Sequence, residues 1–436
     1  MKKLFLLFAF AASTILSFGA VPEDQFRFIS TKDGSTIGLD SLASHQTIEY
    51  SQDATIWTNL TTEITLSLNN GDSIYVRGKL NNSNIYKTDY TKFVINGQIE
   101  AKGNINYLWD YENLNAPLKD YCGYKLFAQC DGLISSPDLP SKDLALGCYQ
   151  EMFRECSNLT KVAILPATRL SESCYNWMFA LCSSLEQVIE LPATTLADNC
   201  YRGMFYGCAA LKKAPELPAT TLAENCYLNM FRRCTNLTDS PELPATTLTE
   251  HCYDLMFAGC TSLTNAPELP ATTLAHSCYS FMFWNCTNLT NAPELPATIL
   301  ASKCYYQMFK NCPTIVTAPE LPALILTDSC YFQIFKGCSL LNSVKCLAVD
   351  ISADLCTYQW LQNVAETGTF VKNAEMDAWS TGYNGIPSGW AVEQAIPTSI
   401  ENIYDASKSS QKVLIDGQVL IQKGDKTYTI TGQEMK

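Results

Sequence analysis

The stretch LPATTLADNCYRGMFYGCAALKKAPE occupies residues 191–216, and it decides the fold because it recurs with a period of 26 residues. A weaker copy precedes the regular units from Asn113, and a decayed copy follows them from Leu347. Self-similarity at a fixed period is typical of a solenoid, in which each unit stacks only on its neighbours. The regular units begin, without insertion, at Leu139, Leu165, Leu191, Leu217, Leu243, Leu269, Leu295 and Leu321.

Each unit repeats the same apolar residues at the same positions, counted here from its first leucine as zero. Cysteine recurs at positions 9 and 17, tyrosine at 10, methionine at 13 and phenylalanine at 14. These positions share one helical stripe, so the pattern CYxxMFxxC predicts a short amphipathic helix whose apolar side packs against neighbouring units. The expected core residues include Cys200, Met204, Phe205, Cys208, Cys226, Met230, Phe231, Cys234, Cys252, Met256, Phe257 and Cys260.

The remainder of each unit, Leu-x-x-Ala-Pro-Glu-Leu-Pro, reads as extended chain. Its proline at position 24 disfavours helix at the residue before it. One short strand per unit, stacked in parallel at about 4.8 Å, would build a narrow sheet. Because proline cannot donate to a ladder, pairing is expected only around position 22. The predicted fold class is therefore α/β, a solenoid with a short parallel strand and a short helix in each 26-residue coil.

The pattern xxMFxGCxxLxxAPxLP resembles the BspA-like leucine-rich repeats of bacterial surface proteins. It matches the aromatic–Gly–Cys–x–x–Leu core of that family, although the LPATTL segment makes these units longer than many of its repeats. The resemblance implies a leucine-rich-repeat solenoid, surface display, and adhesion to host or bacterial molecules. It carries no expectation of catalysis.

The chain begins with a segment that has the features of a secretory signal peptide, assigned to residues 1–19. Lys2 and Lys3 precede an apolar run that ends at Phe18, and Ser17 and Gly19 supply the small residues of a cleavage site. No other apolar run is long enough to cross a bilayer, so no transmembrane segment is expected. The sequence therefore predicts an exported protein.

Residues 20–105 alternate polar and apolar side chains in short runs, for example Ile74-Tyr75-Val76-Arg77. Such runs, separated by turn residues, predict a small N-terminal domain like a β-sandwich. The segment resembles the β domain that precedes the repeats of Bacteroidetes surface proteins. The repeats are assigned to residues 106–373, and the Trp- and Gly-rich residues 374–394 are expected to cap the open end of the solenoid.

Residues 395–436 contain three β-type runs separated by the turn signals Asp416-Gly417 and Lys423-Gly424-Asp425. The ending "DGQ-VLI-GDKTYT-TGQE" resembles the C-terminal sorting domains of the type IX secretion route of Bacteroidetes. This resemblance implies delivery to the cell surface and association with the outer membrane. A plain β-hairpin cap is the alternative.

Composition narrows the possible activities. The chain of 436 residues carries 30 basic and 43 acidic residues, a net charge of −13, which disfavours nucleic acid as a partner because binding it needs lysine and arginine. The three histidines leave little room for histidine-based metal or acid–base chemistry. No phosphate-binding glycine loop, His-Glu-x-x-His motif or nucleophile elbow occurs. We therefore expect no enzyme activity, no cofactor and no metal.

The twenty cysteines form a second, repeated signal. Export and an even number favour disulfides. Eight residues of helix, however, rise about 12 Å, which exceeds the Cα separation that a disulfide spans. Buried thiols acting as small apolar side chains are therefore the favoured interpretation, with disulfides and zinc as the alternatives. Cys346 and Cys356, where the pattern breaks, are the strongest candidates for a disulfide.

One polar column offers a candidate ligand-facing surface. Position 25 is acidic in most units, and stacked carboxylates would repel one another, so the column either binds a cation or basic partner or is simply a solvated edge. Lys212 and Lys213 form a local basic spot near position 22. The acidic column comprises Asp138, Glu190, Glu216, Glu242, Glu268, Glu294 and Glu320.

The sequence thus predicts a secreted, surface-displayed repeat protein whose solenoid binds a protein or glycan partner without catalysis. The alternative is a glycan-binding accessory protein of a surface nutrient-capture system. That alternative requires exposed aromatic platforms, for which Trp177 and Trp284 are candidates because they lie beside the core stripe.

Overall fold

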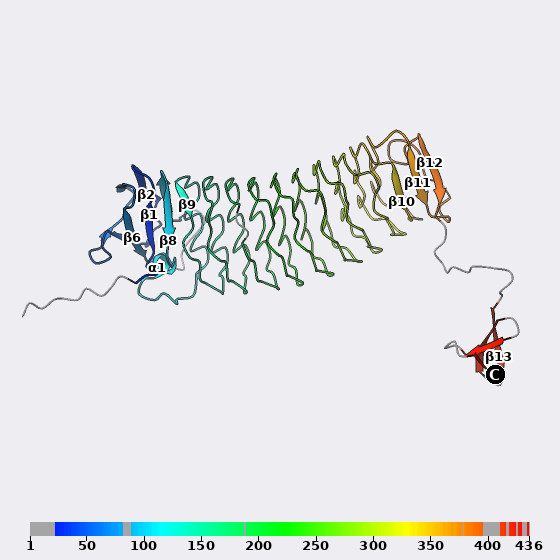
Figure 1. Cartoon of the computed structure of the whole chain (residues 1–436), viewed down its shortest axis with the longest axis horizontal. Helices are drawn as coiled ribbons and strands as arrows, with labels where there is room; N and C mark the ends of the chain where they lie inside the picture. Colours follow the sequence, from blue (N-terminus) through cyan, green and yellow to red (C-terminus); the bar gives the residue numbers. More distant parts are fainter. Residues whose placement is uncertain are drawn as a thin grey trace, which may run out of the picture.

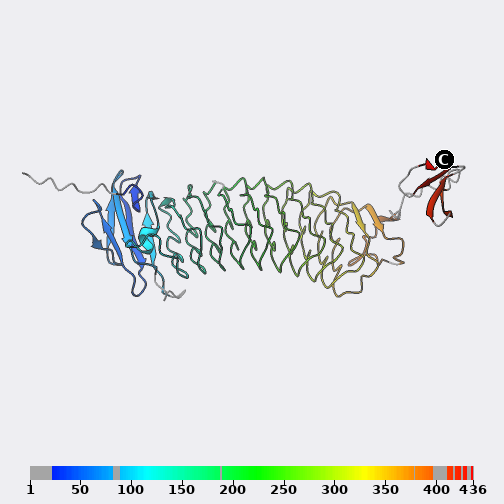
Figure 2. The same ribbon diagram turned by 90° about the horizontal axis from the view of Figure 1, so that it is seen from below.

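The structure is a computed structural model that describes residues 22–81, 89–186, 189–377, 379–395, 410–415, 418–423, 426–429 and 434–435. The predicted signal peptide, residues 1–19, lies outside this part of the chain. The described residues form two sheets near the N-terminus, an elongated stack of coils, and a separate C-terminal sheet (Figures 1 and 2). A coil is one 26-residue unit.

The two N-terminal sheets are built mainly from antiparallel strands, in which buried side chains alternate with half-buried ones, as in β6. They contact each other through Phe28 and Phe93, whose ring centroids are 5.4 Å apart. The first sheet has the order β4(Thr58–Asn59), β3(Ile48–Ser51), β6(Ser73–Gly78), β1(Arg27–Ser30), β8(Ile99–Lys102) and β9(Leu133–Ser135). The second has the order β5(Thr65–Leu68), β2(Ser35–Ser41) and β7(Lys92–Asn96).

The first sheet continues into the stack of coils. Strand β9 comes from the weaker first repeat and pairs in parallel with β8. The first coil is therefore hydrogen-bonded to the N-terminal sheet. Between β8 and β9 lies α1(Asn106–Trp109), the one helix among the described residues. From there the coils follow side by side towards the C-terminal end of the stack (Figure 1).

The prediction of a helix in each coil is wrong. Positions 8–17 instead form a turn ladder, in which every fourth residue has a positive φ, as at Asn199 (56°), Gly203 (60°) and Gly207 (70°). Successive backbone N–H groups alternate between acceptors in their own coil and in the next one. The N–H of Met204 donates to the carbonyl of Tyr201 in its own coil at 3.1 Å, whereas the N–H of Phe205 donates to the carbonyl of Met230 in the next coil at 3.0 Å.

The turn ladder explains why the sequence pattern wrongly predicts a helix. Buried residues recur every four positions at 9, 13 and 17 in the ladder, a spacing that also matches one face of a helix. A helix, however, would use its backbone donors internally. A left-handed residue at every fourth position frees half of the N–H groups to bond the neighbouring coil.

Strand pairing inside the stack is narrower than expected. Outside the turn ladder, most coils pair with the next one only at isolated parallel bridges, such as Lys213 with Asp239 at position 22 and Thr195 with Thr221 at position 4. Continuous parallel strands appear at the C-terminal end of the stack, where β11 lies between β10 and β12. These strands are β10(Ser343–Cys346), β11(Gly368–Lys372) and β12(Trp390–Gln394).

Two tryptophans close this end of the stack. The buried tyrosines at position 10 of successive coils form a column that ends at Tyr331. Trp360 stacks on this last tyrosine, with ring centroids 6.4 Å apart. Its other side meets Trp379 at 5.2 Å, and its Nε1–H donates to the carbonyl of Gly385 at 3.0 Å. Residues from the predicted capping segment thus cover the last aromatic ring of the core.

The C-terminal sheet is antiparallel throughout. Its strands include most of the β-type runs that the sequence marks there, whereas the intervening turn residues 416–417 and 424–425 lie outside the described residues. The strands, in sheet order, are β13(Ser410–Ile415), β14(Gln418–Lys423), β15(Lys426–Thr429) and β16(Glu434–Met435).

Candidate binding surfaces

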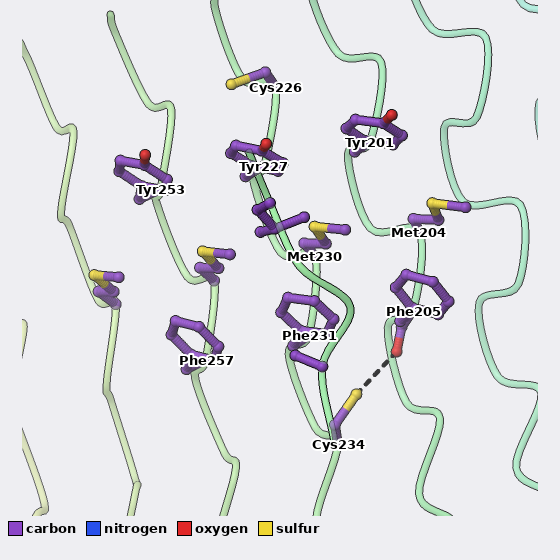
Figure 3. Close-up of a cluster of buried hydrophobic side chains, with 14 of the residues drawn as sticks. Tyr201, Met204, Phe205, Cys226, Tyr227, Met230, Phe231, Cys234, Tyr253 and Phe257 are labelled. Atoms are coloured by element: carbon purple, nitrogen blue, oxygen red, sulfur yellow. Dashed lines mark hydrogen bonds between the residues drawn. The ribbon is translucent and has the colours of Figure 1, made fainter. Parts of the chain in front are cut away.

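The repeated apolar residues fill the inside of every coil. The rings of Phe205 and Phe231 stack with centroids 5.7 Å apart, and those of Tyr201 and Tyr227 are 5.9 Å apart (Figure 3). The methionines lie between the two aromatic columns in the same view. All twelve core residues named from the sequence are fully buried, so these side chains cannot contact a ligand: Cys200, Met204, Phe205, Cys208, Cys226, Met230, Phe231, Cys234, Cys252, Met256, Phe257 and Cys260.

The twenty cysteines are buried free thiols, in agreement with the interpretation favoured from the sequence, although the helix used in that argument is absent. The thiol at position 17 donates a hydrogen bond to the phenylalanine carbonyl of the preceding coil, as from Cys208 to Phe179 at 3.1 Å. Burial raises the pKa of Cys208 to about 12, so this thiol is protonated at neutral pH and is a poor nucleophile.

The acidic column lies along an edge of the stack, where in most coils a buried proline precedes an exposed carboxylate, as at Pro215 and Glu216. Glu320 ends the column with an ion pair to Lys345 at 2.7 Å. Among the described residues, the other position-25 carboxylates form no ion pair: Asp138, Glu190, Glu216, Glu242, Glu268 and Glu294.

Shallow hollows separate neighbouring coils along this acidic edge. Prolines and position-25 glutamates line three consecutive hollows, between Glu190 and Glu268. Lys213 lines two of them, whereas Lys212 points towards Glu186 at 3.9 Å. The structure thus brings Lys213 beside the acidic column and keeps Lys212 apart from it.

A different surface, which we call the turn face, consists of the side chains at positions 11, 12, 15 and 16 of the turn ladder. From the coil that begins at Leu191 to the one that begins at Leu347, this face has one acidic residue, Asp254. Among the described residues, none of its five basic side chains pairs with a carboxylate. They are Arg202, Arg232, Arg233, Lys310 and Lys336.

Aromatic rings lie on the turn face in two groups, which together form what we call the aromatic strip. In its C-terminal part, Tyr306 stacks on Phe332 at 4.5 Å, and Phe332 stacks on Tyr358 at 4.9 Å. This strip was not predicted from the sequence, although aromatic residues stand at position 11 of three consecutive units. The strip comprises Trp177, Tyr206, Phe281, Trp284, Tyr306, Phe332 and Tyr358, and Tyr383 of the predicted capping segment contacts its last ring.

An arginine bridges the two parts of the aromatic strip. The guanidinium of Arg232 lies 5.9 Å from the ring centroid of Tyr206 and 6.0 Å from that of Trp284. Both distances fall within the range in which a cation is attracted to an aromatic ring. The two tryptophans singled out from the sequence, Trp177 and Trp284, therefore belong to one continuous surface and are half-buried in it.

An amide ladder flanks the strip at position 12. Gln333 donates to Gln359 at 2.8 Å, and the ammonium groups of Lys310 and Lys336 donate to glutamine oxygens of this ladder at 2.9 and 2.6 Å. The lysines are held in place while their positive charges remain unpaired. Burial, and then the charge of Lys336, lowers the pKa of Lys310.

Two of the three histidines come together on the same side of the stack. Nδ1 of His251 lies 2.9 Å from a carboxylate oxygen of Asp254, and the rings of His251 and His276 are 5.3 Å apart. Burial raises the pKa of Asp254 to about 6, against the opposing hydrogen bond and charge of His251. His276 also contacts Ser302 at 2.7 Å. The spacing of 25 residues between the two histidines was the sequence signal for this contact.

The residues that the structure describes contain no group of three or more His, Cys, Asp or Glu side chains able to hold a metal ion. They also contain no helix of sufficient length and hydropathy to cross a membrane.

Comparison with known proteins agrees with the coiled architecture. The family model described as BspA type leucine rich repeat region, in 6 copies, matches residues 113–212, 149–290 and 254–353. No curated protein and no solved structure matches the chain. The family matches together span more than half of the sequence and coincide with the stacked coils. The chain therefore belongs to the BspA-type leucine-rich-repeat family.

Proposed function

We propose that this protein is a non-catalytic binding protein whose repeat solenoid, displayed at the cell surface, holds a macromolecular partner. The observation that carries the proposal is the contrast between core and surface. The core repeats the same buried residues in coil after coil, whereas the turn face differs from coil to coil. A rigid scaffold that presents varied side chains at regular intervals is suited to recognising an extended partner.

The composition of the turn face favours a protein partner. Tryptophan, tyrosine and arginine dominate the energetic centres of protein interfaces, and Trp177, Tyr206 and Arg232 meet on this face. The acidic edge, by comparison, consists largely of exposed glutamates with prolines between them. We therefore place the partner on the turn face rather than on the acidic column.

A glycan-binding accessory role is the second candidate. Sugars stack on aromatic ring faces, and the half-buried indoles of Trp177 and Trp284 supply the observation in its favour. The rings of Tyr306, Phe332 and Tyr358, however, cover one another's faces. This arrangement presents ring edges rather than open platforms, so we rank the glycan role below the protein-binding role.

The export part of the proposal rests on the two ends of the chain. We propose that residues 1–19 direct secretion and that residues 395–436 act as a sorting module of type IX character, next to the repeat solenoid and the N-terminal β-sandwich. Cell fractionation of the full chain and of a chain lacking residues 395–436 tests the sorting step. Surface location that survives the truncation would contradict it.

A binding screen tests the central proposal. The purified full chain is applied to a glycan array and to a panel of host-matrix and bacterial surface proteins. We expect saturable binding to at least one protein of the panel. Binding confined to glycans would favour the second candidate, and absence of binding to both sets would refute a binding function for the solenoid.

A further inference from the structure

We propose that the turn face binds an extended, acidic segment of a partner protein, laid lengthwise across successive coils. This inference rests on the proposed binding function and specifies both the surface and the chemistry of the partner. It comes from three observations, namely the charge of the turn face, the packing of its rings, and its length.

Charge is the first observation. The whole chain has a net charge of −13, yet the turn face between the coils of Leu191 and Leu347 has five basic residues and a single acidic one. That acidic residue, Asp254, is buried and paired with His251. A basic strip on an acidic molecule attracts a negatively charged segment and repels copies of the protein itself.

Carboxylates on the other faces do not neutralise these basic residues. Arg202 and Arg232 are held by asparagine oxygens at 3.4 and 3.2 Å, and Lys336 is held by Gln359. The Asp254 carboxylate acts electrostatically on Arg202 and Arg232, but among the described residues no carboxylate forms an ion pair with any of these three cations. An incoming carboxylate can therefore form a charge-assisted hydrogen bond without displacing an existing ion pair.

Ring packing is the second observation. The rings of Tyr306 and Phe332 are nearly parallel, with an angle of 9° between their planes, so their faces are occupied and their edges remain. Ring edges carry partial positive charge, which adds to the attraction for carboxylates and offers apolar contact to side chains. These features suit an acidic peptide that contains aromatic or aliphatic residues better than a polysaccharide.

Length is the third observation. From Tyr206 to Tyr358 the aromatic strip crosses six coil-to-coil steps, and neighbouring core rings such as Phe231 and Phe257 are 5.7 Å apart. The strip is therefore on the order of 35 Å long, which about ten residues of extended chain would cover. A segment of that length could engage Arg202, Arg232 and Lys336 together.

The test measures binding of soluble polyanions to the full chain by fluorescence anisotropy. The probes are poly-L-glutamate, a copolymer of glutamate and tyrosine, and polygalacturonate, which carries carboxylates on a sugar backbone. We expect the glutamate–tyrosine copolymer to bind tightest and polygalacturonate weakest, with all affinities falling as salt screens the charges. Tightest binding of polygalacturonate would overturn the inference in favour of a glycan.

A matched pair of variants locates the surface. Arg232→Gln/Arg233→Gln removes two adjacent positive charges from the turn face, and Lys212→Gln/Lys213→Gln removes two from the strand side of the preceding coil. We expect the first pair to weaken copolymer binding about tenfold and the second to leave it within about twofold. Equal effects of the two pairs, or no binding of either polypeptide at low salt, would overturn the inference.

Two controls keep the result interpretable. Thermal unfolding shows whether the arginine variant is folded, and Lys310→Gln/Lys336→Gln repeats the test at the other end of the strip. Failure of the inference differs from failure of the proposed function. A panel protein whose binding is insensitive to both turn-face variants preserves the binding function and refutes this surface.

Discussion

The thiol of Cys234 donates a hydrogen bond to the carbonyl oxygen of Phe205 in the preceding coil, at 3.0 Å (Figure 3). The same carbonyl accepts the N–H of Cys208 at 3.1 Å, so it closes a turn in its own coil and binds the next one. The same thiol contact recurs along the stack, for example from Cys260 to Phe231 at 3.1 Å. Cysteine suits this position because its side chain is small, apolar and still a donor.

Removing this thiol should weaken the stack measurably. We expect Cys234→Ala to lower the free energy of unfolding by about 1–3 kcal/mol, through the lost donor and the space left in the core. Cys226→Ala is the matched control, because Cys226 is equally buried but its sulfur lies 4.0 Å from the nearest carbonyl partner. Urea unfolding of both variants tests the idea, and an equal loss in both would show that the thiol hydrogen bond contributes nothing.

The thiols should be unreactive until the protein unfolds. Burial raises the pKa of Cys286 and Cys312 strongly, to about 12 for Cys286, so little thiolate exists near neutral pH. We expect thiol titration of the native chain to find almost no reactive cysteine, and titration in denaturant without reductant to find all twenty. A substantially lower count after denaturation would reveal disulfides and contradict the thiol ladder.

The left-handed turns make a further prediction about glycine. In Gly259→Ala the new Cβ would lie 3.6 Å from Arg233, an ordinary contact, whereas in Gly207→Ala it would lie 2.7 Å from a methyl group of Leu181. Both glycines have positive φ. We expect Gly259→Ala to cost about 1–2 kcal/mol for the backbone alone, and Gly207→Ala to cost more. Thermal unfolding of the two variants compares these terms, and equal losses would contradict the steric difference.

The converse substitution checks the same backbone argument. Lys303 is exposed and has a φ of 57°, so Lys303→Gly should relieve backbone strain. Glycine's greater freedom in the unfolded chain partly offsets that gain. We expect a net rise in stability of up to about 1 kcal/mol. A loss of stability in this variant would mean that the turn ladder does not hold position 8 in the left-handed region.

The sequence was sufficient to predict the repeat and its buried residues, because composition at a fixed period reports burial directly. Methionine at position 13 and phenylalanine at position 14 recur in successive units, and Met204 and Phe205, which occupy these positions, are fully buried. It was insufficient to predict the backbone that presents them. A buried residue every four positions fits both a helix and a chain of turns, and only contacts such as that of Phe205 with Met230 distinguish the two.

The candidate surface was predicted only in part, for a related reason. The acidic column was visible because Glu216 and Glu242 occupy the same position in neighbouring units. The strip was less visible because Tyr206 and Trp284 occupy position 15 in coils that are not adjacent, and Arg232 connects them. Predicting contacts between side chains of different coils requires the distance between successive coils, and the sequence does not provide this distance.

The buried carboxylate of Asp254 should make stability depend on pH. Its folded-state pKa, raised to about 6 mainly by burial, lies above the value of 3.8 expected in the unfolded chain. The associated stability is therefore complete below the unfolded pKa and is lost as the pH rises through the folded one. Relative to Asp254→Asn, we expect the natural chain to lose about 3 kcal/mol between about pH 4 and pH 7.

Urea unfolding of both proteins across this range isolates the effect of Asp254, because the other titrating groups are shared. The folded environment of this carboxylate includes His251, Arg202 and Arg232, all of which oppose the rise in its pKa. Parallel stability curves for the two proteins would show that these cations fully compensate the cost of burying the charge.

Repulsion within the acidic column should lower the stability of the protein slightly. Glu216, Glu242 and Glu268 are exposed neighbours in successive coils and lack ion-pair partners among the described residues. We expect Glu216→Gln/Glu242→Gln/Glu268→Gln to raise the free energy of unfolding by up to about 1 kcal/mol at low salt, because their mutual repulsion disappears. High salt should abolish the gain by screening.

A control with the same change of charge separates this local repulsion from the net charge of the chain. Glu63→Gln/Glu375→Gln/Glu393→Gln removes three exposed carboxylates that do not form a column, so its effect should be near zero. Urea unfolding at low and high salt compares the two triple variants. If the column variant is instead less stable than the natural chain, the carboxylates accept stabilising hydrogen bonds. The column would then be part of the structure of the coils rather than a tolerated repulsion.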